Sequence, residues 1–460
     1  MSIETIVQAQ REYFATGATL PVTLRKEALI RLQAEIRRRE DILCEAMRQD
    51  LNKSHYESYM CEIGLVLDEL GHTIRKMEKW ARPKRAATPL AQFSARSYMM
   101  KEPYGLTLVM APWNYPFLLS MDPVIGAIAA GNCVVLKPSA YAPATSRAMA
   151  ELIAAVFDPR WVAVVEGGRK ENSALLDQKF DYIFFTGGVT VGKLVMEKAS
   201  QHLTPVTLEL GGKSPVIVDE TADIPLTARR LAFGKVLNAG QTCVAPDYLL
   251  VQRSVKDKLV EELKKQFVKM LGEDPLHNPD FVRIINRKHF ERLQGLLADE
   301  TLLYGGQTRA DEVSGWVAPT LVDACDPEHC KPMQEEIFGP ILPVIPYDTL
   351  EEAIAFVNAR PKPLALYLFT KSKHSREQVL RRCSYGGGCV NDTIIHLATH
   401  EMPFGGVGNS GMGGYHGKFS FDTFSHTKSI VDKACWIDLP LRYFPYTSKL
   451  YDKMVHLFLR

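Results

Sequence analysis

The first part of the chain carries a helical pattern of hydrophobic and polar positions. In residues 25–51, "RKEALIRLQAEIRRREDILCEAMRQDL", apolar residues recur at helical spacing between charged ones, and residues 57–80 repeat this pattern. The periodicity predicts amphipathic helices as far as Pro83. The stretch from Lys84 to Pro103 lacks it and is expected to be an irregular or extended connection.

From Leu106 onward, short apolar runs alternate with helical segments. The runs "LTLVMAP", "NCVVLKPS", "WVAVVEG" and "DYIFFTG" predict strands, and a second block of the same kind begins with "PVTLELGGKSPVIVD". Such alternation is typical of βαβ units and a mostly parallel sheet. We therefore expect an α/β fold with two doubly wound domains that meet between His202 and Gly211. Ligands of such sheets bind at the carboxyl ends of the strands.

Composition narrows the classes of function. The 460 residues include 55 basic and 53 acidic ones, and this balance gives no electrostatic case for a nucleic-acid partner. No apolar run is long enough to predict a membrane-spanning helix, and the N-terminus does not resemble a signal peptide. The nine cysteines favour a reducing compartment, so a cytoplasmic location is expected.

Cysteine and histidine spacings do not predict a metal site. No CxxC pair occurs, and the nearest candidates are Cys325-x3-His329-Cys330 and His396-x3-His400. Neither matches a zinc-binding pattern, so no metal is expected.

One cysteine has an unusual setting. Cys243 follows the turn "NAGQT" and precedes an apolar run. It is either a small buried thiol or a nucleophile at the mouth of a pocket. A nucleophile requires a base and a donor to an oxyanion.

Both partners have candidates. Glu209 ends the apolar run of "TLELGGKSP", where desolvation would raise its pKa and make it a usable base. Asn114, in "APWNYP", follows a strand and carries an amide suited to a developing oxyanion. Each residue could instead have a structural role only. Glu209 could be a salt-bridged glutamate at the end of a strand, and Asn114 an ordinary asparagine in a turn.

Other motifs suggest a bound dinucleotide. In "FFTGGVTVGKL", Gly187 and Gly192 flank the start of a helix, whose N-terminus favours a phosphate, although the spacing is also explained by tight packing. Lys137 in "LKPSA" ends a buried strand, within expected reach of a cofactor ribose. Glu336 and Phe338 in "QEEIFGP" precede a Gly-Pro turn that could equally be an ordinary loop.

Together these motifs resemble the aldehyde dehydrogenases, from about residue 20 to about residue 430. The resemblance is carried by "APWNYP", "LKPS", "FTGG…VGK", "LELGGKSP", "NAGQTC", "EEIFGP" and "MPFGGVGNSGMGGYHG". The short N-terminus and "GMGGYHGKFSFDTFSH" are most similar to the class 3 branch. That branch oxidises medium and long aliphatic and aromatic aldehydes and is typically dimeric.

The resemblance implies a role for each matched residue. Cys243 would be the nucleophile, Glu209 the general base and Asn114 the oxyanion amide. The cofactor, NAD or NADP, would contact Pro112, Trp113, Lys137, Ser139, Gly187, Gly188, Val191, Gly192, Leu210, Glu336 and Phe338.

The resemblance also implies a domain plan and a homodimer. Residues 1–83 and 103–208 would form the nicotinamide-binding domain, and residues 209–395 the catalytic domain. Residues 84–102 and 396–430 would form a small β-flap for oligomerisation, and residues 431–460 a C-terminal tail.

Two positions depart from the class 3 pattern. Ala140 stands where a glutamate is usual, and Gly188 replaces a serine, so the choice between NAD and NADP stays open. Two other functions are compatible with parts of this pattern. A CoA-acylating enzyme would share the thiol but would not need Glu209, and a non-catalytic binding protein would not need to keep Cys243, Glu209 and Asn114 together.

Overall fold

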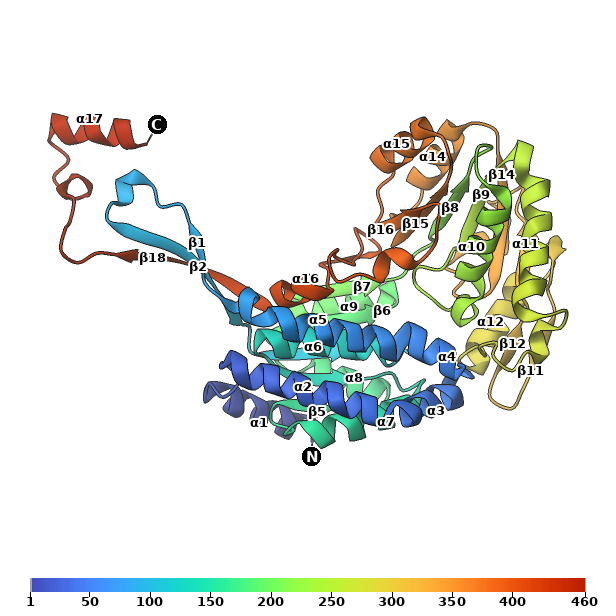
Figure 1. Ribbon diagram of the computed structural model, residues 1–460, viewed down its shortest axis with the longest axis horizontal. Helices are drawn as coiled ribbons and strands as arrows, with labels where there is room; N and C mark the ends of the chain where they lie inside the picture. Colours follow the sequence, from blue (N-terminus) through green and yellow to red (C-terminus); the bar gives the residue numbers. More distant parts are fainter. Residues whose placement is uncertain (1, 460) are drawn as a thin grey trace.

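The computed structural model describes residues 2–459 and begins with a layer of helices (Figure 1). Their apolar residues fall on one face, as Ala28, Leu29, Leu32 and Ile36 do in α2, and these side chains are fully buried. The helical prediction for this region is confirmed. The elements are α1 (Ile3–Ala15), α2 (Val22–Arg38), α3 (Glu40–Leu51), α4 (His55–Ser58), the π-helical turn η1 (Tyr59–Ile63) and α5 (Gly64–Ala81).

The first sheet has six strands in the order β17-β7-β6-β3-β4-β5. Its strands are β3 (Leu106–Met110), β4 (Cys133–Lys137), β5 (Val162–Val164), β6 (Tyr182–Gly187), β7 (Val206–Leu210) and β17 (Gly411–Met412), and all are parallel except β17. The intervening helices are α6 (Leu118–Ala130), α7 (Pro143–Val156), α8 (Arg169–Leu176) and α9 (Val189–Ser200). The chain reverses direction across the sheet between β3 and β6, and this reversal creates a crevice at their carboxyl ends.

The second sheet has seven strands in the order β10-β13-β14-β9-β8-β15-β16. Its strands are β8 (Pro215–Val218), β9 (Tyr248–Gln252), β10 (Leu302–Tyr304), β13 (Thr320–Asp323), β14 (Ile341–Tyr347), β15 (Ala365–Phe369) and β16 (Gly387–Val390). Only β10 is antiparallel. Helices α10 (Ile224–Val236), α11 (Lys256–Leu271), α12 (Arg287–Leu297), α13 (Lys331–Gln334), α14 (Leu350–Asn358) and α15 (Lys373–Arg382) accompany it, with a small hairpin of β11 (Thr308–Ala310) and β12 (Gly315–Val317). The predicted α/β alternation is thus present in both blocks.

A three-stranded antiparallel sheet projects from the body as an arm (Figure 1). It consists of β1 (Lys84–Ala86), β2 (Ala95–Pro103) and β18 (Ser425–Lys433), with the short turn η2 (Leu90–Gln92) near its tip. The tail continues beyond β18 to η7 (Pro440–Arg442) and α17 (Lys449–Phe458), which lies beside the arm and away from the body.

Within the expected flap segment 396–430, the structure places only the residues from Ser425 onward in the arm. Only β18 joins the arm, and it extends to Lys433. Before it, the turn η6 (Ile395–Leu397) precedes β17, which pairs with β7, and α16 (Gly417–Thr423) packs against α5 and α6. The segment stays on the body because Phe421 and Phe424 are buried in the core there. Among residues 2–459, no helix combines the length and the apolar character needed to cross a bilayer.

Candidate active site

Cys243 follows a turn with left-handed backbone geometry. The turn η3 (Leu237–Gly240) has φ values of 51° at Asn238, 51° at Ala239 and 70° at Gly240. Left-handed conformations are costly for residues other than glycine, so they persist only where the surroundings hold them. Gly240 is also required sterically, since a Cβ there would lie 2.4 Å from the carbonyl oxygen of Gly339.

Hydrogen bonds from distant segments hold this turn. The backbone N–H of Asn238 donates to Glu57 Oε1 at 2.8 Å, and Asn238 Nδ2 donates to the backbone oxygen of Asn114 at 2.8 Å. Gln241 Nε2 donates to the carbonyl oxygen of Arg283 at 3.1 Å. The asparagine and glutamine of "NAGQTC" therefore position the turn that presents Cys243.

Cys243 is partly buried and lines two separate cavities. The first, of about 510 Å³, opens at the carboxyl ends of the first sheet's strands, and we call it the polar cavity. Its lining residues are Pro112, Trp113, Asn114, Leu119, Thr186, Gly187, Gly188, Thr190, Glu209, Leu210, Gly211, Cys243, His289, Arg292, Glu335, Glu336 and Phe338.

The second cavity, of about 200 Å³, lies on another side of Cys243, and we call it the apolar funnel. Most of its side chains are hydrophobic, and Leu119 and Cys243 are shared with the polar cavity. The lining residues are Met60, Cys61, Leu65, Tyr115, Leu118, Leu119, Phe233, Leu237, Thr242, Cys243, Val244, Ile394, Ile395, Leu397, Ala398, Phe404, Tyr415 and His416.

Glu209, at the end of β7, is an uncompensated buried carboxyl group. The residue is 2% exposed, and neither Oε1 nor Oε2 has a hydrogen-bond partner among the described residues. Burial without a partner raises the pKa of Glu209 well above its ordinary value. Burial therefore favours the protonated form of Glu209 and makes the carboxylate a strong base once it ionises.

The thiol of Cys243 is also hard to ionise in this state. Burial raises its pKa to about 12, and the nearby carboxyl groups of Glu336 and Glu209 act in the same direction. A thiolate therefore forms near neutral pH only if a nearby base accepts the proton of the Cys243 thiol.

Asn114 is placed with its amide facing the same cavity. The side chain is buried, and Nδ2 donates to the carbonyl oxygen of Gln241 at 3.0 Å. This bond occupies one of the two amide N–H groups, which leaves the other for a ligand. Lys53, buried in an ion pair with Glu62, donates to the backbone oxygen of Asn114 at 3.2 Å.

The predicted cofactor residues divide into two groups. Pro112, Trp113, Gly187, Gly188, Leu210, Glu336 and Phe338 line the polar cavity, whereas Lys137, Ser139, Val191 and Gly192 do not. Lys137 Nζ donates to the carbonyl oxygens of Pro138 at 2.7 Å and Gly167 at 2.6 Å, and burial lowers its pKa to about 8. Gly192 has a packing role, since a Cβ there would lie 2.6 Å from Leu210 Cδ2.

Several cavity residues were not predicted from the sequence: Thr186, Thr190, His289, Arg292 and Glu335. Arg292, on α12, donates from Nη2 to the carbonyl oxygen of Ile337 at 2.6 Å and from Nη1 to Glu335 Oε1 at 2.9 Å. It thereby fixes the "EEIFGP" loop. Nothing in the local pattern of α12 identifies this role, although Thr186 and Thr190 adjoin the recognised glycines.

The polar cavity fits a dinucleotide. Glu336 Oε1 has no hydrogen-bond partner among the described residues, and burial raises the pKa of this carboxyl group to about 8. A ribose hydroxyl is the kind of donor that would satisfy it. Gly188, at the N-cap of α9, leaves open space where a side chain would stand, beside the free N–H groups of the helix.

The comparisons with known proteins identify the family. The profile described as the aldehyde dehydrogenase family matches residues 1–430. This chain belongs to the aldehyde dehydrogenase family. Among curated relatives, the 4,4'-diaponeurosporen-aldehyde dehydrogenase of Staphylococcus aureus is 46% identical, and the alignment covers 97% of each chain. Aldehyde dehydrogenase family 3 member B1 of rat is 47% identical, over 97% of this chain and 96% of the relative.

Solved structures agree with this assignment and with the predicted fold class. A substrate-bound state of Staphylococcus aureus AldH superposes with a TM-score of 0.97 at 45% identity and full coverage of both chains. An indole-3-acetaldehyde dehydrogenase in complex with NAD+ gives a TM-score of 0.86 at 28% identity, over 93% of this chain and 88% of that one. The class 3-like resemblance is therefore confirmed, the chain is an aldehyde dehydrogenase, and a nicotinamide cofactor is supported.

Proposed function

We propose that the enzyme oxidises medium or long aliphatic, or aromatic, aldehydes to carboxylic acids through a thioester on Cys243. The observation that carries this proposal is the position of Cys243, which lines both the polar cavity and the apolar funnel. An aldehyde carbon held at this junction meets the thiol, with its hydrocarbon part on one side and the cofactor on the other.

The funnel's lining favours an apolar aldehyde. Leucine, isoleucine and phenylalanine side chains dominate it, and burial of hydrocarbon against such a surface contributes about 25 cal/mol per Å². The S. aureus relative is named for the aldehyde that it oxidises, 4,4'-diaponeurosporen-aldehyde, which agrees with an aldehyde substrate here. The few polar groups of the funnel, among them Thr242 and His416, leave little to recognise a charged substrate.

The first step is addition of the Cys243 sulfur to the aldehyde carbon. The thiol proton leaves as the C–S bond forms, and Glu209, in the same cavity, accepts it once ionised. The carbonyl electron pair moves to oxygen, where the second N–H of the Asn114 amide stabilises the negative charge. Loss of one such donor typically lowers kcat by about 10² to 10³.

The polar cavity would hold the dinucleotide that oxidises the substrate. Thr186, Gly187, Gly188 and Glu336 would hold the dinucleotide, whose oxidised nicotinamide, when bound, supplies an acceptor for the hydride. With the hydride removed, the carbon attached to Cys243 is a thioester. Apolar side chains such as the buried Leu119 and the half-buried Phe338 exclude bulk water from this junction.

Hydrolysis then releases the acid. After the proton taken from the thiol has left Glu209 for solvent, Glu209 accepts a proton from a water molecule, whose oxygen forms a bond to the thioester carbon while the C–S bond breaks and Cys243 leaves as a thiolate. The overall reaction consumes an aldehyde, a water molecule and an oxidised nicotinamide, and it yields a carboxylate, a reduced nicotinamide and two protons. Enzymes that pass the acyl group to CoA or to phosphate do not need a carboxylate base at this position. The presence of Glu209 therefore favours hydrolysis by water.

The Cys243→Ala variant tests the proposal. It should lose aldehyde oxidation while it still binds the dinucleotide, since only the covalent step is removed. The measurements are nicotinamide reduction at 340 nm with a long-chain aldehyde and cofactor binding by calorimetry. Activity close to that of the parent enzyme would exclude Cys243 as the nucleophile.

A second experiment distinguishes hydrolysis of the thioester from transfer of the acyl group to CoA. The parent enzyme should form free carboxylic acid at the same rate with and without added CoA. A product that appears only as acyl-CoA would instead assign the CoA-acylating reaction.

A further inference from the structure

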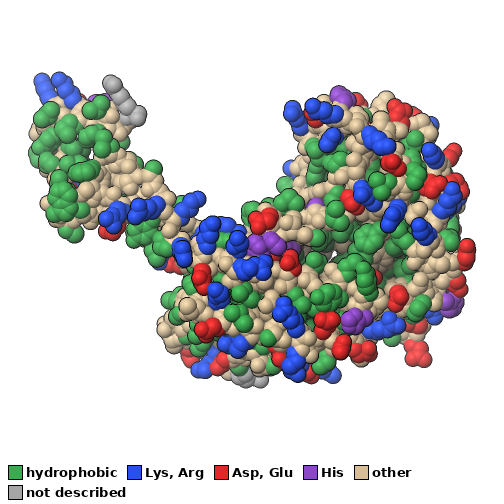
Figure 2. Space-filling view, in the orientation of Figure 1, with side chains coloured by type: hydrophobic (Ala, Val, Ile, Leu, Met, Phe, Trp, Pro, Cys, Tyr) green, Lys and Arg blue, Asp and Glu red, His purple; other side chains and the backbone are tan. Residues whose placement is uncertain are grey.

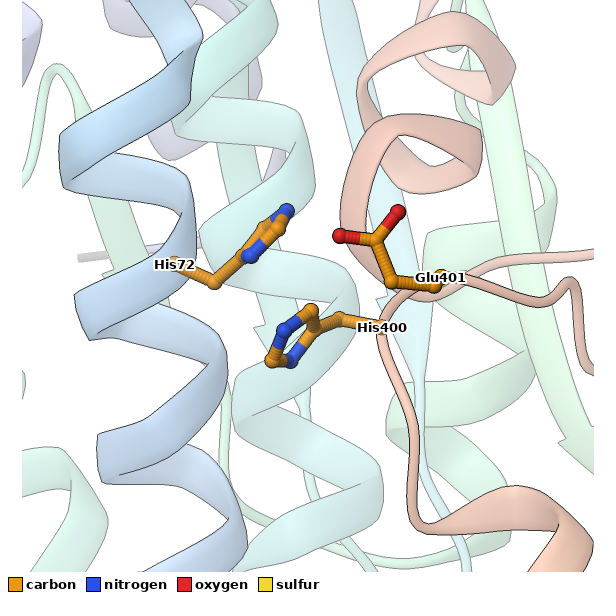
Figure 3. Close-up of side chains that lie close together, drawn as sticks. All are labelled: His72, His400 and Glu401. Atoms are coloured by element: carbon orange, nitrogen blue, oxygen red, sulfur yellow. The ribbon is translucent and has the colours of Figure 1, made fainter.

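A cluster of two histidines and a glutamate lies outside the active site, on the body beside the base of the arm. His72 comes from α5, and His400 and Glu401 from the loop after η6. Their ligand atoms all lie within 4.8 Å of one another. Figure 3 shows the two imidazoles facing each other and the Glu401 carboxylate turned toward His72. Their ring centroids are 3.8 Å apart.

His72 is the most informative member. Its residue is 6% exposed, yet its imidazole takes part in no hydrogen bond with any residue between 2 and 459. His72 therefore presents an unpartnered imidazole to the groove, beside a second imidazole and a carboxylate whose ligand atoms are close enough to share one ion.

His400 is oriented for coordination from its other nitrogen. Its Nδ1 lies 3.3 Å from Asp68 Oδ2, also on α5. Metal-bound histidines commonly donate their second ring N–H to a carboxylate, which fixes the tautomer and directs Nε2 at the ion. Asp68 is therefore in the position of an outer-shell partner.

The donor set selects the class of ion. Two imidazoles and one carboxylate, with water in a fourth position, suit Zn²⁺ and related divalent transition metals better than Mg²⁺ or Ca²⁺. Glu401 forms no ion pair with another described side chain. The groove that holds the cluster is also lined by lysines, including Lys76, Lys79 and Lys418, so an anion is the main rival ligand.

The cluster lies between the loop 394–401 and helix α5, and both of these elements contribute residues to the lining of the apolar funnel. Ile394, Ile395, Leu397 and Ala398, directly before His400, line the funnel. Leu65, on the same helix α5 as His72, lines it as well. An ion held by both elements would restrain the loop against the helix, next to the path of the substrate.

We propose that His72, His400 and Glu401 form a divalent transition-metal site that ties the loop 394–401 to α5 and so restrains one wall of the apolar funnel. The site differs from the catalytic centre, and the binding itself does not depend on the proposed reaction.

Calorimetric titration of the full chain with Zn²⁺ tests the binding. Thiols also bind zinc, so the parent for this experiment carries Cys243→Ser, Cys325→Ser and Cys435→Ser, which removes the partly buried nucleophile and the two exposed cysteines. We expect one zinc per chain at the cluster, and its loss in His72→Ala and in His400→Ala. The exposed His374 on α15 provides the matched control, since His374→Ala should bind as the parent does.

Variants at exposed positions keep the test valid where the histidine variants fail to fold. Glu401→Gln should weaken zinc binding, and Asp68→Asn should weaken it by about tenfold or more, the usual effect of losing an outer-shell carboxylate. Hydrogen exchange provides an independent readout. Zinc should slow exchange in residues 394–401 of the parent but not of His72→Ala.

Three results would overturn the proposal: equal zinc affinity in the parent and in His72→Ala, no zinc binding by the parent, and unchanged exchange in residues 394–401 at saturating zinc. Inorganic phosphate is titrated in parallel. Binding of phosphate in place of zinc would assign the groove to anions and would also overturn the proposal.

Discussion

At the scale of single residues, the ionisation of Glu209 links stability to chemistry. A buried carboxyl group without partners is expensive to charge, and this expense makes it a strong proton acceptor when it does ionise. In the described structure no cation or hydrogen-bond donor offsets its burial. The same isolation that raises the pKa of Glu209 therefore suits it to take a proton from water or from the thiol.

Glu209→Gln should slow hydrolysis of the thioester more than its formation. The amide keeps the shape of the side chain but cannot accept a proton from water. After the variant is mixed with aldehyde and cofactor, intact-mass spectrometry should detect an acyl group on Cys243. Slow turnover without that adduct would assign the base for hydrolysis to another group.

The same substitution should stabilise the protein increasingly as pH rises. Since folding raises the pKa of Glu209, the unfolded chain loses this proton first, and the carboxyl group costs stability from the unfolded pKa, near 4.3, upward. Glutamine does not titrate. The melting temperature of Glu209→Gln minus that of the parent should therefore be larger at pH 8 than at pH 5, and a constant difference would contradict the raised pKa.

Ala140 is the residue to change for cofactor preference. A carboxylate beside the adenosine ribose accepts hydrogen bonds from its hydroxyls and repels a 2′-phosphate, and this exposed alanine supplies neither effect. We expect the parent to use both NAD and NADP. Ala140→Glu should shift the ratio of kcat/KM toward NAD by about tenfold to a hundredfold, the range for charge-assisted hydrogen bonds. An unchanged ratio would place the determinant elsewhere.

At the scale of elements, the packing of α9 on β7 decides how the first sheet presents its crevice. Gly192→Val should lower the free energy of unfolding by about 1–3 kcal/mol, because the new side chain meets Leu210. Gly188→Ala is the matched control, since a Cβ there meets nothing within 4 Å and the backbone φ of −75° accepts alanine. Urea denaturation of both variants measures the difference, and equal stability would refute the packing role.

Local motifs predicted the parts of the site that come from single turns. The helical and strand periodicities and the segments around Cys243, Glu209 and Asn114 are readable from neighbouring residues because each turn is specified locally. The contributions of Arg292, His289 and Glu57 are not, since α12 and α4 reach the site only through the packing of the two sheets. The family resemblance implied cofactor contacts for Lys137 and Gly192. In the structure, Lys137 donates to backbone carbonyl oxygens, and Gly192 packs against Leu210.

At the scale of the whole molecule, contacts between segments that are far apart in the sequence cannot be predicted from local sequence patterns. The spacing His396-x3-His400 did not predict a metal site, and the fold places His400 against His72 on α5, more than 300 residues earlier in the sequence. The flap was expected to take all of residues 396–430. The fold retains most of that segment on the body, because its buried aromatic residues gain more there than an exposed arm could offer.

The arm and tail carry the last prediction, a homodimer. Trp436, Phe444 and Leu457 are 75%, 83% and 64% exposed, and Figure 2 shows hydrophobic side chains gathered on this projecting region. Exposed apolar patches of this kind mark protein interfaces, and we expect the occupant to be a second copy of the chain, as the resemblance to the typically dimeric class 3 branch implies. Light scattering should give about twice 51.6 kDa for the parent. The double variant Phe444→Asp and Leu457→Asp should give a monomer, whereas Leu203→Asp, at a 91% exposed leucine outside the arm, should remain dimeric. A monomeric parent, or a double variant that stays dimeric, would show that the arm and tail do not form the interface.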